Sequence, residues 1–139
     1  MHTYVHKVHY YETDKMGITH HSNYVRWMEE ARIDYLDNIG CSFAKLERDG
    51  GIVSPVIGVE CQYKHPTTFG DEVEIAVGVE KFNGVRLTIC YTMTDKATGD
   101  LVLTGKTTHC FTSDGGKPVV LKKRFPDLDK ILREQAIMP

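Results

Sequence analysis

The sequence predicts an α+β domain in which one long helix packs against an antiparallel sheet of five strands. Between Ser22 and Ile39, apolar residues recur every three or four positions, which is the spacing of a helix with one wide buried face. At positions 73–80 and 87–94, apolar and polar residues alternate instead, as they do in half-buried strands. A single helix followed by consecutive strands is typical of this fold class.

Composition indicates one ordinary globular domain that spans residues 1–139. The chain is 41% hydrophobic and 26% charged, and its length falls within the range of single domains. Its net charge of −2 provides no basic field, so nucleic acid is a poor candidate partner. The sequence contains no apolar run long enough for a membrane span, and its start lacks the apolar stretch of a signal peptide.

The cysteines and histidines argue against disulfides and against a metal site. The four cysteines are scattered, without a C-x-x-C pair, and no export signal precedes them. A reduced, cytoplasmic protein is therefore expected. None of the seven histidines has the H-E-x-x-H spacing of a zinc site, so we expect no metal.

The first third of the chain predicts a strand, a turn and the long helix. Thr3 to Tyr11 is rich in tyrosine and valine and predicts a strand, and the polar segment Glu12 to Gly17 predicts a turn. We expect Ser22 or a neighbouring histidine at the N-cap of the helix and Gly40 at its C-terminal end. The predicted buried stripe of the helix consists of Tyr24, Trp27, Met28, Ala31, Tyr35, Leu36 and Ile39.

The rest of the chain predicts four more strands and a short final helix. The segment from Cys41 to Gly51 has no clear period and is expected to be irregular. Strands are predicted at Val56–Lys64, at 73–80, at 87–94 and, after a turn at Thr98-Gly99, from Leu101 to Phe111, where Leu101, Leu103 and Phe111 share one face. A helix is predicted at Pro126–Gln135, because proline is tolerated in a first helical turn. Such a sheet leaves exposed edges, which favours association with a second copy.

One segment resembles the signature of a known enzyme family. The family pattern is T-D-x-x-G, five residues, N-Y, an aromatic residue and E-x-A-R. The matching residues here are Thr13, Asp14, Gly17, Asn23, Tyr24, Trp27, Glu29, Ala31 and Arg32. The segment is similar to that of the 4-hydroxybenzoyl-CoA thioesterase family, and Tyr63, Pro66, the run 70–72 and the run 116–119 extend the resemblance along nearly the whole chain.

The resemblance implies a fold, an activity and an assembly. The fold is the hotdog fold, in which a curved five-stranded antiparallel sheet wraps a long central helix. The activity is hydrolysis of an acyl-CoA or acyl-carrier-protein thioester in a groove between subunits. The assembly is a homodimer or a dimer of dimers, that is, a homotetramer. No cofactor is implied, because the CoA or pantetheine arm belongs to the substrate.

Asp14 is the predicted catalytic carboxylate. An aspartate has an ordinary pKa of about 3.9 and is ionised at neutral pH. It can attack the thioester carbon directly, which gives a mixed anhydride, or activate a water as general base, and the sequence leaves both routes open. The family places an oxyanion donor seven residues later, which here is the backbone N–H of His21 at the start of the helix.

Further residues receive candidate roles, each beside a simpler structural one. Gly17 would let the turn bend close to the substrate. The His21 side chain is a candidate catalytic group that can orient water or protonate the leaving thiolate, or it can be solvated. Asn23 and Tyr24 are candidate substrate-binding residues, although an asparagine near a helix start often satisfies backbone donors. For the CoA phosphates, the predicted cations are Lys122, Lys123 and Arg124, with Lys64, Lys81 and Arg86 as further candidates.

Alternative interpretations concern the nucleophile, the reaction and the acyl group. Glu29 is a possible helix nucleophile, but an ion pair with Arg32, three residues later, is the simpler role. A hotdog dehydratase or hydratase, or a non-catalytic binder of acyl thioesters, would use the same scaffold. The acyl group stays open. Its predicted pocket residues are Met16, Ile18, Tyr24, Ile57, Val59 and Tyr63.

Overall fold

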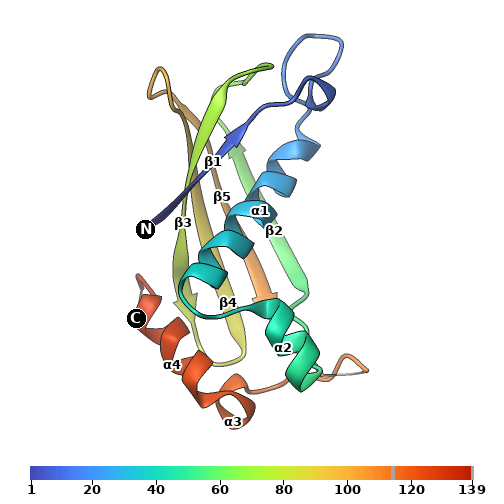
Figure 1. Ribbon diagram of the computed structural model, residues 1–139, viewed down its shortest axis with the longest axis vertical. Helices are drawn as coiled ribbons and strands as arrows, with labels where there is room; N and C mark the ends of the chain where they lie inside the picture. The colour runs from blue at the N-terminus through green and yellow to red at the C-terminus, as the bar shows by residue number, and fades with distance from the viewer. Residues whose placement is uncertain (114, 139) are drawn as a thin grey trace.

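Five antiparallel strands form one sheet that curves around a long helix in the computed structural model, which describes residues 1–113 and 115–138 (Figure 1). In chain order the elements are β1 (His2–Lys7), a 3-10 turn (Tyr10–Glu12), α1 (Ser22–Asn38), α2 (Phe43–Gly50), β2 (Val56–Tyr63), β3 (Glu72–Phe82), β4 (Arg86–Asp95), β5 (Leu101–Cys110), α3 (Leu121–Arg124) and α4 (Pro126–Gln135). Across the described part of the chain, every helix is too short or too polar to cross a membrane.

The order of strands in the sheet is β1-β3-β4-β5-β2. The strands β3, β4 and β5 form the predicted run of neighbouring antiparallel strands. β2 does not pair with β3, the strand that follows it, but crosses to β5, where Val59 lies opposite Thr107. β1 pairs with the other side of β3, where Tyr4 lies opposite Ile75. The two edges of the sheet are therefore β1 and β2.

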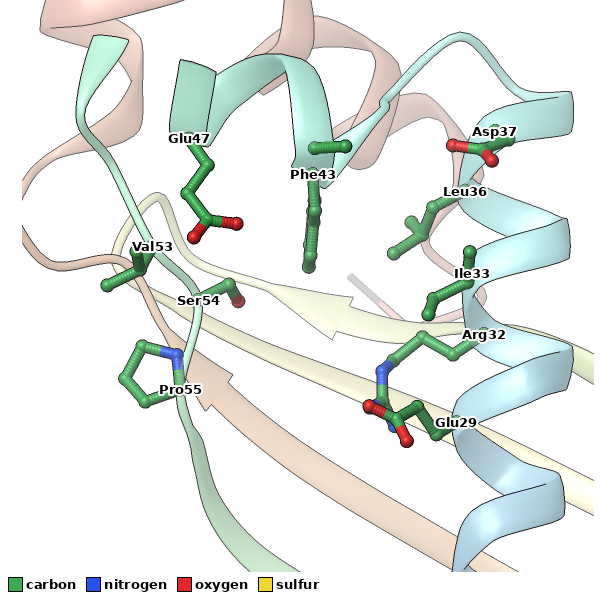
Figure 2. Close-up of a pocket in the computed structure, with 11 residues that line it drawn as sticks. Glu29, Arg32, Ile33, Leu36, Asp37, Phe43, Glu47, Val53, Ser54 and Pro55 are labelled. Atoms are coloured by element: carbon green, nitrogen blue, oxygen red, sulfur yellow. The ribbon is translucent and has the colours of Figure 1, made fainter.

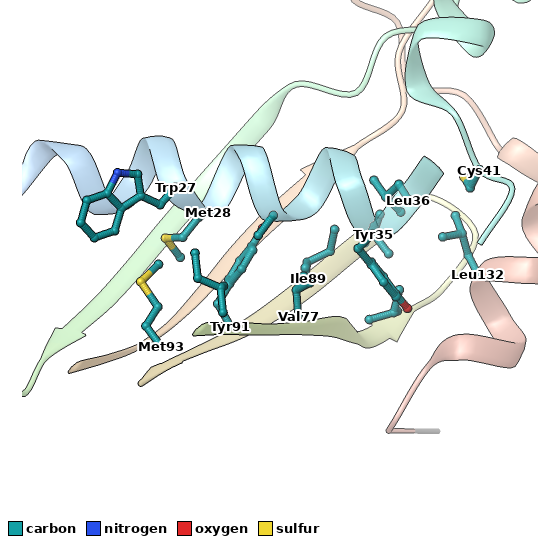
Figure 3. Packing of buried hydrophobic residues seen from close by; sticks show 14 of the residues in the cluster. Trp27, Met28, Tyr35, Leu36, Cys41, Val77, Ile89, Tyr91, Met93 and Leu132 are labelled. Carbon is teal, nitrogen blue, oxygen red and sulfur yellow. The ribbon is translucent and has the colours of Figure 1, made fainter. Parts of the chain in front are cut away.

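The core lies between α1 and the concave face of the sheet (Figure 3). Trp27 and Met28 on α1 are fully buried, as predicted from the helical stripe, and Met93 of β4 packs on the same side. Gly105 in β5 lies directly beneath the helix. A Cβ atom at Gly105 would lie 2.6 Å from Met28 Cε and 2.9 Å from the Glu60 carbonyl oxygen. The Met28 methyl group is the end of a flexible side chain, but the Glu60 carbonyl belongs to β2, the strand paired with β5, so a side chain at position 105 would disturb this pairing.

Three predictions about elements were wrong. The strand predicted from Thr3 to Tyr11 ends at Lys7, and Tyr10–Glu12 forms a 3-10 turn. The segment from Cys41 to Gly51 contains helix α2, whose first turn is capped by the Ser42 hydroxyl and whose end is formed by Gly51 at φ +61°. Both capping signals were present in the sequence, but the helix is short. Leu101 does not share the inward face with Leu103 and is 40% exposed. The β4–β5 register shifts at Met93/Thr94, so the alternation of faces is interrupted at the start of β5.

A chain of polar side chains crosses the core from α1 to β5. Arg32 donates to the Tyr91 hydroxyl at 3.2 Å, that hydroxyl lies 2.5 Å from Thr107 Oγ1, and Thr107 Oγ1 lies 2.8 Å from His109 Nε2. Burial, with a smaller contribution from the Arg32 charge, lowers the pKa of His109 to about 4, while the Ser54 backbone acts in the opposite direction. His109 is therefore neutral at neutral pH.

His109 should make the fold sensitive to mild acid. Above pH ~6.5, the ordinary histidine pKa, the imidazole is neutral in both states and pH has no effect through it. Between pH ~6.5 and about 4 the unfolded chain binds the proton first, so the free energy of unfolding falls as pH falls. We expect a loss on the order of 2–3 kcal/mol across this range that is absent in His109→Gln, measured by urea denaturation at each pH.

His65→Gln is the matched control, because the His65 side chain is 52% exposed. It should leave the pH dependence of the wild type unchanged. If His109→Gln loses as much stability as the wild type over this pH range, the buried imidazole is not the acid-sensitive group.

Candidate active site

Asp14 lies in a tightly closed loop, here called the Asp14 loop (residues 13–19). An isolated bridge between Thr13 and Thr19 closes the base of the loop. Inside it, the Asp14 N–H donates to the Ile18 carbonyl at 2.9 Å and the Gly17 N–H donates to the Asp14 carbonyl at 3.0 Å. Gly17 has φ +78°, which confirms the conformational role predicted for this glycine. The Asp14 carboxylate accepts the Met16 N–H at 2.8 Å through Oδ1 and is partly exposed.

The segment after β2 supports the Asp14 loop from outside. The Thr19 N–H donates to the Thr67 carbonyl at 2.8 Å, and the hydroxyls of the same two residues lie 2.7 Å apart. The Thr68 hydroxyl donates to the Gly17 carbonyl at 2.7 Å. The loop therefore has a defined position relative to the sheet, although most of its side chains face solvent.

Helix α1 begins immediately after the Asp14 loop. His21 occupies the N-cap position without a side-chain hydrogen bond, and the capping group is the neighbouring His20, whose Nδ1 lies 2.8 Å from Ser22 Oγ and accepts the Ser22 N–H at 3.3 Å. Within the described residues, the His21 N–H donates to no group. A free N–H at the positive end of α1 is the feature that an oxyanion donor requires.

The other two candidate residues at the start of α1 are buried. The Asn23 amide donates to the Glu12 carbonyl at 2.9 Å and to the His20 carbonyl at 3.2 Å, and its oxygen accepts from Arg26. These contacts favour the structural role for Asn23, because its polar atoms are already engaged. The Tyr24 hydroxyl lies 3.1 Å from Thr67 Oγ1.

A shallow groove runs beside the start of α1. It is lined by Ile18, Thr19, His21, Tyr24, Tyr63, Lys64, His65 and Pro66. The Asp14 loop borders this groove through Ile18, which accepts the Asp14 N–H. The floor is aromatic, with the rings of Tyr24 and Tyr63 5.6 Å apart. Of the candidate cations, Lys64 lines the groove, whereas Lys81 and Arg86 line a different hollow.

The basic run that was predicted to bind CoA phosphates lies at the other end of the molecule. Lys122, Lys123 and Arg124 form α3, and α3 and the Asp14 loop lie toward opposite ends of the long axis of the molecule (Figure 1). The 17 residues of α1 alone span roughly 25 Å at 1.5 Å per residue. Arg124 donates to the Gly50 carbonyl at 2.9 Å. Within one chain, these three residues and Asp14 do not form one site.

A second hollow lies between α1, α2 and the segment that precedes β2 (Figure 2). Glu29, Arg32 and Ser54 provide polar groups on its wall, and much of the rest is apolar. The ion pair predicted between Glu29 and Arg32 does not form, because the buried guanidinium turns inward to the Tyr91 hydroxyl. The hollow includes no residue of the Asp14 loop, so the groove beside Asp14 is the better candidate for chemistry.

Glu12 lies in this region but was not among the predicted site residues. Glu12 is 5% exposed although it lies in a polar turn, and its carboxylate accepts from the His9 N–H at 2.8 Å, from His6 at 2.8 Å and from the Trp27 indole at 2.7 Å. Burial alone would raise the pKa of Glu12, but these hydrogen bonds outweigh it and hold the pKa below its ordinary value. A glutamate between a tyrosine and a threonine in a turn carries no local signal of such burial.

Comparison with known proteins identifies relatives over most of the chain. The thioesterase-like superfamily matches residues 8–135. The Bacillus subtilis (strain 168) protein named "Putative acyl-CoA thioesterase YneP" is 33% identical over 122 residues, which are 87% of each chain. The structure of DHNA-CoA thioesterase from Staphylococcus aureus has a TM-score of 0.88 and 35% identity, over 93% of this chain and 86% of that one.

A more distant structure extends the likeness in fold. The gentisyl-coenzyme A thioesterase BH1999 has a TM-score of 0.81 and 22% identity, over 93% of this chain and 99% of that one, and supports the fold alone. The likeness confirms the predicted hotdog fold. The relatives are named for different CoA thioesters, so they support the wider superfamily and do not single out 4-hydroxybenzoyl-CoA.

Gly17→Val should impair the Asp14 loop through backbone strain. A Cβ at Gly17 meets nothing within 4 Å, so the effect comes from forcing a β-branched residue to φ +78°. Because the Gly17 N–H holds the Asp14 carbonyl, relief of that strain displaces Asp14. We expect catalytic efficiency toward a thioester to fall ~10–100-fold, the effect typical of a misplacement of about 1 Å.

Gly99→Val is the matched control. Gly99 has the same φ of +78° in the turn between β4 and β5, and a Cβ there also meets nothing within 4 Å. Both variants should lower the melting temperature by a similar amount, but only Gly17→Val should lower activity. If Gly17→Val is as active as Gly99→Val, the Asp14 loop tolerates a β-branched residue at position 17.

Proposed function

The chain belongs to the thioesterase-like superfamily, and on that premise we propose that it hydrolyses an acyl-CoA thioester with Asp14 as the catalytic carboxylate. One observation carries the assignment of the site. A partly exposed carboxylate is fixed in a closed loop shortly before a helix whose N-cap residue, His21, has an N–H that donates to no described group. Thioester hydrolysis requires these two elements together, a base or nucleophile and a donor for the oxyanion.

The proposed reaction has two routes that share one transition-state donor. In the first, Asp14 removes a proton from water while the water oxygen bonds to the thioester carbon, and collapse of the tetrahedral intermediate breaks the C–S bond. In the second, an Asp14 oxygen bonds to that carbon and expels the thiolate, and water then hydrolyses the mixed anhydride. In both, the His21 N–H stabilises the negative charge on the former carbonyl oxygen.

The His21 side chain is our proposed proton donor for the leaving group. The residue is exposed and lines the groove, and its ring lies 4.4 Å from that of His20. A histidine at this position can supply the proton that converts the departing thiolate into a thiol. Because the oxyanion donor is a main-chain group, replacing the His21 side chain removes only this second contribution.

The groove favours an acyl group with an apolar or aromatic body. Tyr63 is 53% exposed and leans against Tyr24, so a flat substituent can pack on the two rings. Several relatives are named for aromatic CoA esters, which include 1,4-dihydroxy-2-naphthoyl-CoA. We include 4-hydroxybenzoyl-CoA among the candidate substrates because the motif around Asp14 resembles the signature of that family.

We propose that two copies pair along β2, which is an edge of the sheet. Ile57 and Val59 are 47% and 49% exposed, which is unusual for apolar residues on a strand. Val59 shares a face with Cys61, which contacts Met28, so it lies on the side of the sheet that carries α1, whereas Ile57 lies at the register shift between Val56 and Gly58. A second copy would extend the sheet and cover this apolar surface, and two such dimers would form the predicted tetramer.

Pairing of this kind offers a role for the basic run in α3. Two β2 strands related by a two-fold axis run antiparallel, so the α3 end of one copy lies toward the Asp14 end of the other (Figure 1). Lys122 and Lys123 would then contribute to phosphate binding in the partner's groove, while Lys64 contributes within its own chain. The same cations would suit an acidic carrier protein as the thioester donor.

A cytoplasmic setting fits the thiol chemistry of the chain. All four cysteines are free, and burial raises the pKa of the Cys41 thiol to about 12. A reducing compartment keeps such thiols unpaired.

Asp14→Asn should abolish most thioester turnover while preserving the fold. The carboxamide oxygen can still accept the Met16 N–H, but it is neither a nucleophile nor a base. We expect kcat to fall by roughly 100-fold or more, a loss in the range of general-base catalysis. Release of free thiol from acetyl-, medium-chain, benzoyl-, hydroxybenzoyl- and naphthoyl-CoA, followed with a thiol-reactive dye, measures this.

Asp71→Asn is the matched control, because the Asp71 carboxylate also caps a turn by accepting the Thr68 N–H at 2.9 Å. It should retain wild-type turnover. A near wild-type rate in Asp14→Asn would remove Asp14 from the mechanism. Hydration of crotonyl-CoA without thiol release would support the hydratase alternative, and binding of CoA esters without turnover would support the non-catalytic one.

Val59→Lys should weaken the proposed dimer. The substitution places a charge within the apolar face beside α1, where a second copy would desolvate it. We expect the mass measured by light scattering at micromolar concentration to shift toward the monomer.

Gln62→Lys is the control for this shift. It adds the same charge to β2, but at the opposite alternation, and so on the other face of the sheet. Its mass should match that of the wild type. A Val59→Lys protein that stays as associated as Gln62→Lys would place the interface elsewhere.

A further inference from the structure

The Glu12 carboxylate connects three parts of the chain at the base of the Asp14 loop. Oε1 lies 2.8 Å from His6 Nε2 on β1 and accepts the His9 N–H at 2.8 Å, and Oε2 accepts the Trp27 indole N–H on α1 at 2.7 Å. All three contacts are buried or partly buried. Bonds to a buried carboxylate are stronger than those between neutral groups.

The Glu12 backbone extends the same connection to the start of α1. Its carbonyl accepts the His20 N–H at 2.8 Å and the Asn23 amide at 2.9 Å. Glu12 therefore contacts residues on both sides of the free His21 N–H, and it lies two residues before Asp14. Through its side chain and backbone, Glu12 thus hydrogen-bonds to β1, to α1 and to the residue before His21, while its own backbone leads into the Asp14 loop.

From this geometry we propose that Glu12 is a positioning residue, which fixes the Asp14 loop relative to the oxyanion donor at the start of α1. The proposal rests on the proposed function, because it concerns the same reaction. Glu12 does not line the groove, and it acts through the loop that it holds. A small change in its hydrogen bonds would alter the geometry between carboxylate and donor, to which catalysis is sensitive.

A metal ion is the competing use of this cluster. Ligand atoms of His6, His9 and Glu12 lie within 4.8 Å of one another. The Glu12 oxygens, however, already accept two N–H groups, from the His9 backbone and the Trp27 indole, and lie in hydrogen-bond contact with His6. A cation would compete with these donors for the same lone pairs. The burial of Glu12 and its donor set favour a carboxylate that organises protein groups.

Glu12→Gln tests the proposal because it changes acceptors without changing shape. Glutamine has one oxygen and one NH2 group in place of two oxygens. When the oxygen accepts from His9 and faces His6, the NH2 group faces the Trp27 N–H, and two donors meet. We expect kcat to fall ~10–100-fold with KM changed by less than about threefold, because the loop shifts while the groove walls remain.

A second substitution should restore activity. Trp27→Phe keeps an aromatic ring in the core and removes the N–H that the glutamine NH2 group would face. The double variant Glu12→Gln/Trp27→Phe should therefore recover kcat to within about threefold of Trp27→Phe alone, a non-additive result expected only of interacting residues. Recovery in the double variant would support donor matching at Glu12, and a lack of recovery would overturn it.

A readout that does not depend on activity separates this proposal from the proposed function. Trp27 is the single tryptophan, so the protein has one indole N–H signal in a proton–nitrogen correlation spectrum. In Glu12→Gln this signal and the amide signals of residues 13–19 should shift together, while Glu80→Gln, an isosteric change on β3, should leave them in place. Loss of turnover in Glu12→Gln without these shifts would overturn the positioning role. A kcat of Glu12→Gln equal to that of the wild type would overturn it as well.

The two proposals fail in different ways. A wild-type protein that releases no thiol from any thioester overturns the function, whatever the spectra show. An active wild type in which Asp14→Asn is inactive and Glu12→Gln is fully active overturns only the role of Glu12. Circular dichroism and thermal melting of each variant confirm that rates are compared between folded proteins. If Glu12→Gln alone does not fold, the double variant Glu12→Gln/Trp27→Phe is compared with Trp27→Phe.

Discussion

The close approach of α1 to the middle of the sheet is the contact on which the structure depends. Met28 on α1 lies over Gly105, where a Cβ atom would lie 2.6 Å from Met28 Cε and 2.9 Å from the Glu60 carbonyl oxygen of β2. With the helix seated, its apolar stripe and the inward residues of β3, β4 and β5 form one continuous core. The helix cannot tilt or slide without opening cavities in a densely packed interior, so the position of its N-terminus is fixed by the core.

The site follows from where that fixed helix begins. The Asp14 loop carries few buried side chains of its own and is held by hydrogen bonds from Thr67 and Thr68, while Glu12 directly before it is the proposed second support. A rigid core thus presents, at its surface, a short polar loop and the His21 N–H, which donates to no described group. Enzymes commonly carry polar reacting groups on loops that a rigid core supports, because these groups need solvent access while their geometry needs rigid support.

The side of α1 that faces α2 and the segment before β2 is only partly covered in a single copy. Arg32 is buried beside a hollow and hydrogen-bonds only to Tyr91 among its described partners, and apolar residues of β2 face solvent nearby. An isolated buried cation and an exposed apolar edge are both costly. Both features lie on the face that the proposed second copy would cover, so association of two copies would also bury this side of α1.

The sequence by itself determined most of the elements and singled out the residues proposed to react. The helical stripe of α1, the alternation in β3 and β4, the turn at Gly17 and the Asp14 motif are local patterns, and local patterns follow from backbone geometry. The tertiary structure alone decided that β2 crosses to β5, that Arg32 turns to Tyr91 and away from Glu29, that Lys122 to Arg124 lie far from Asp14, and that Glu12 is buried. Each of these depends on contacts between residues distant in sequence, and a charged side chain in a turn shows the same local pattern whether it faces water or a buried indole.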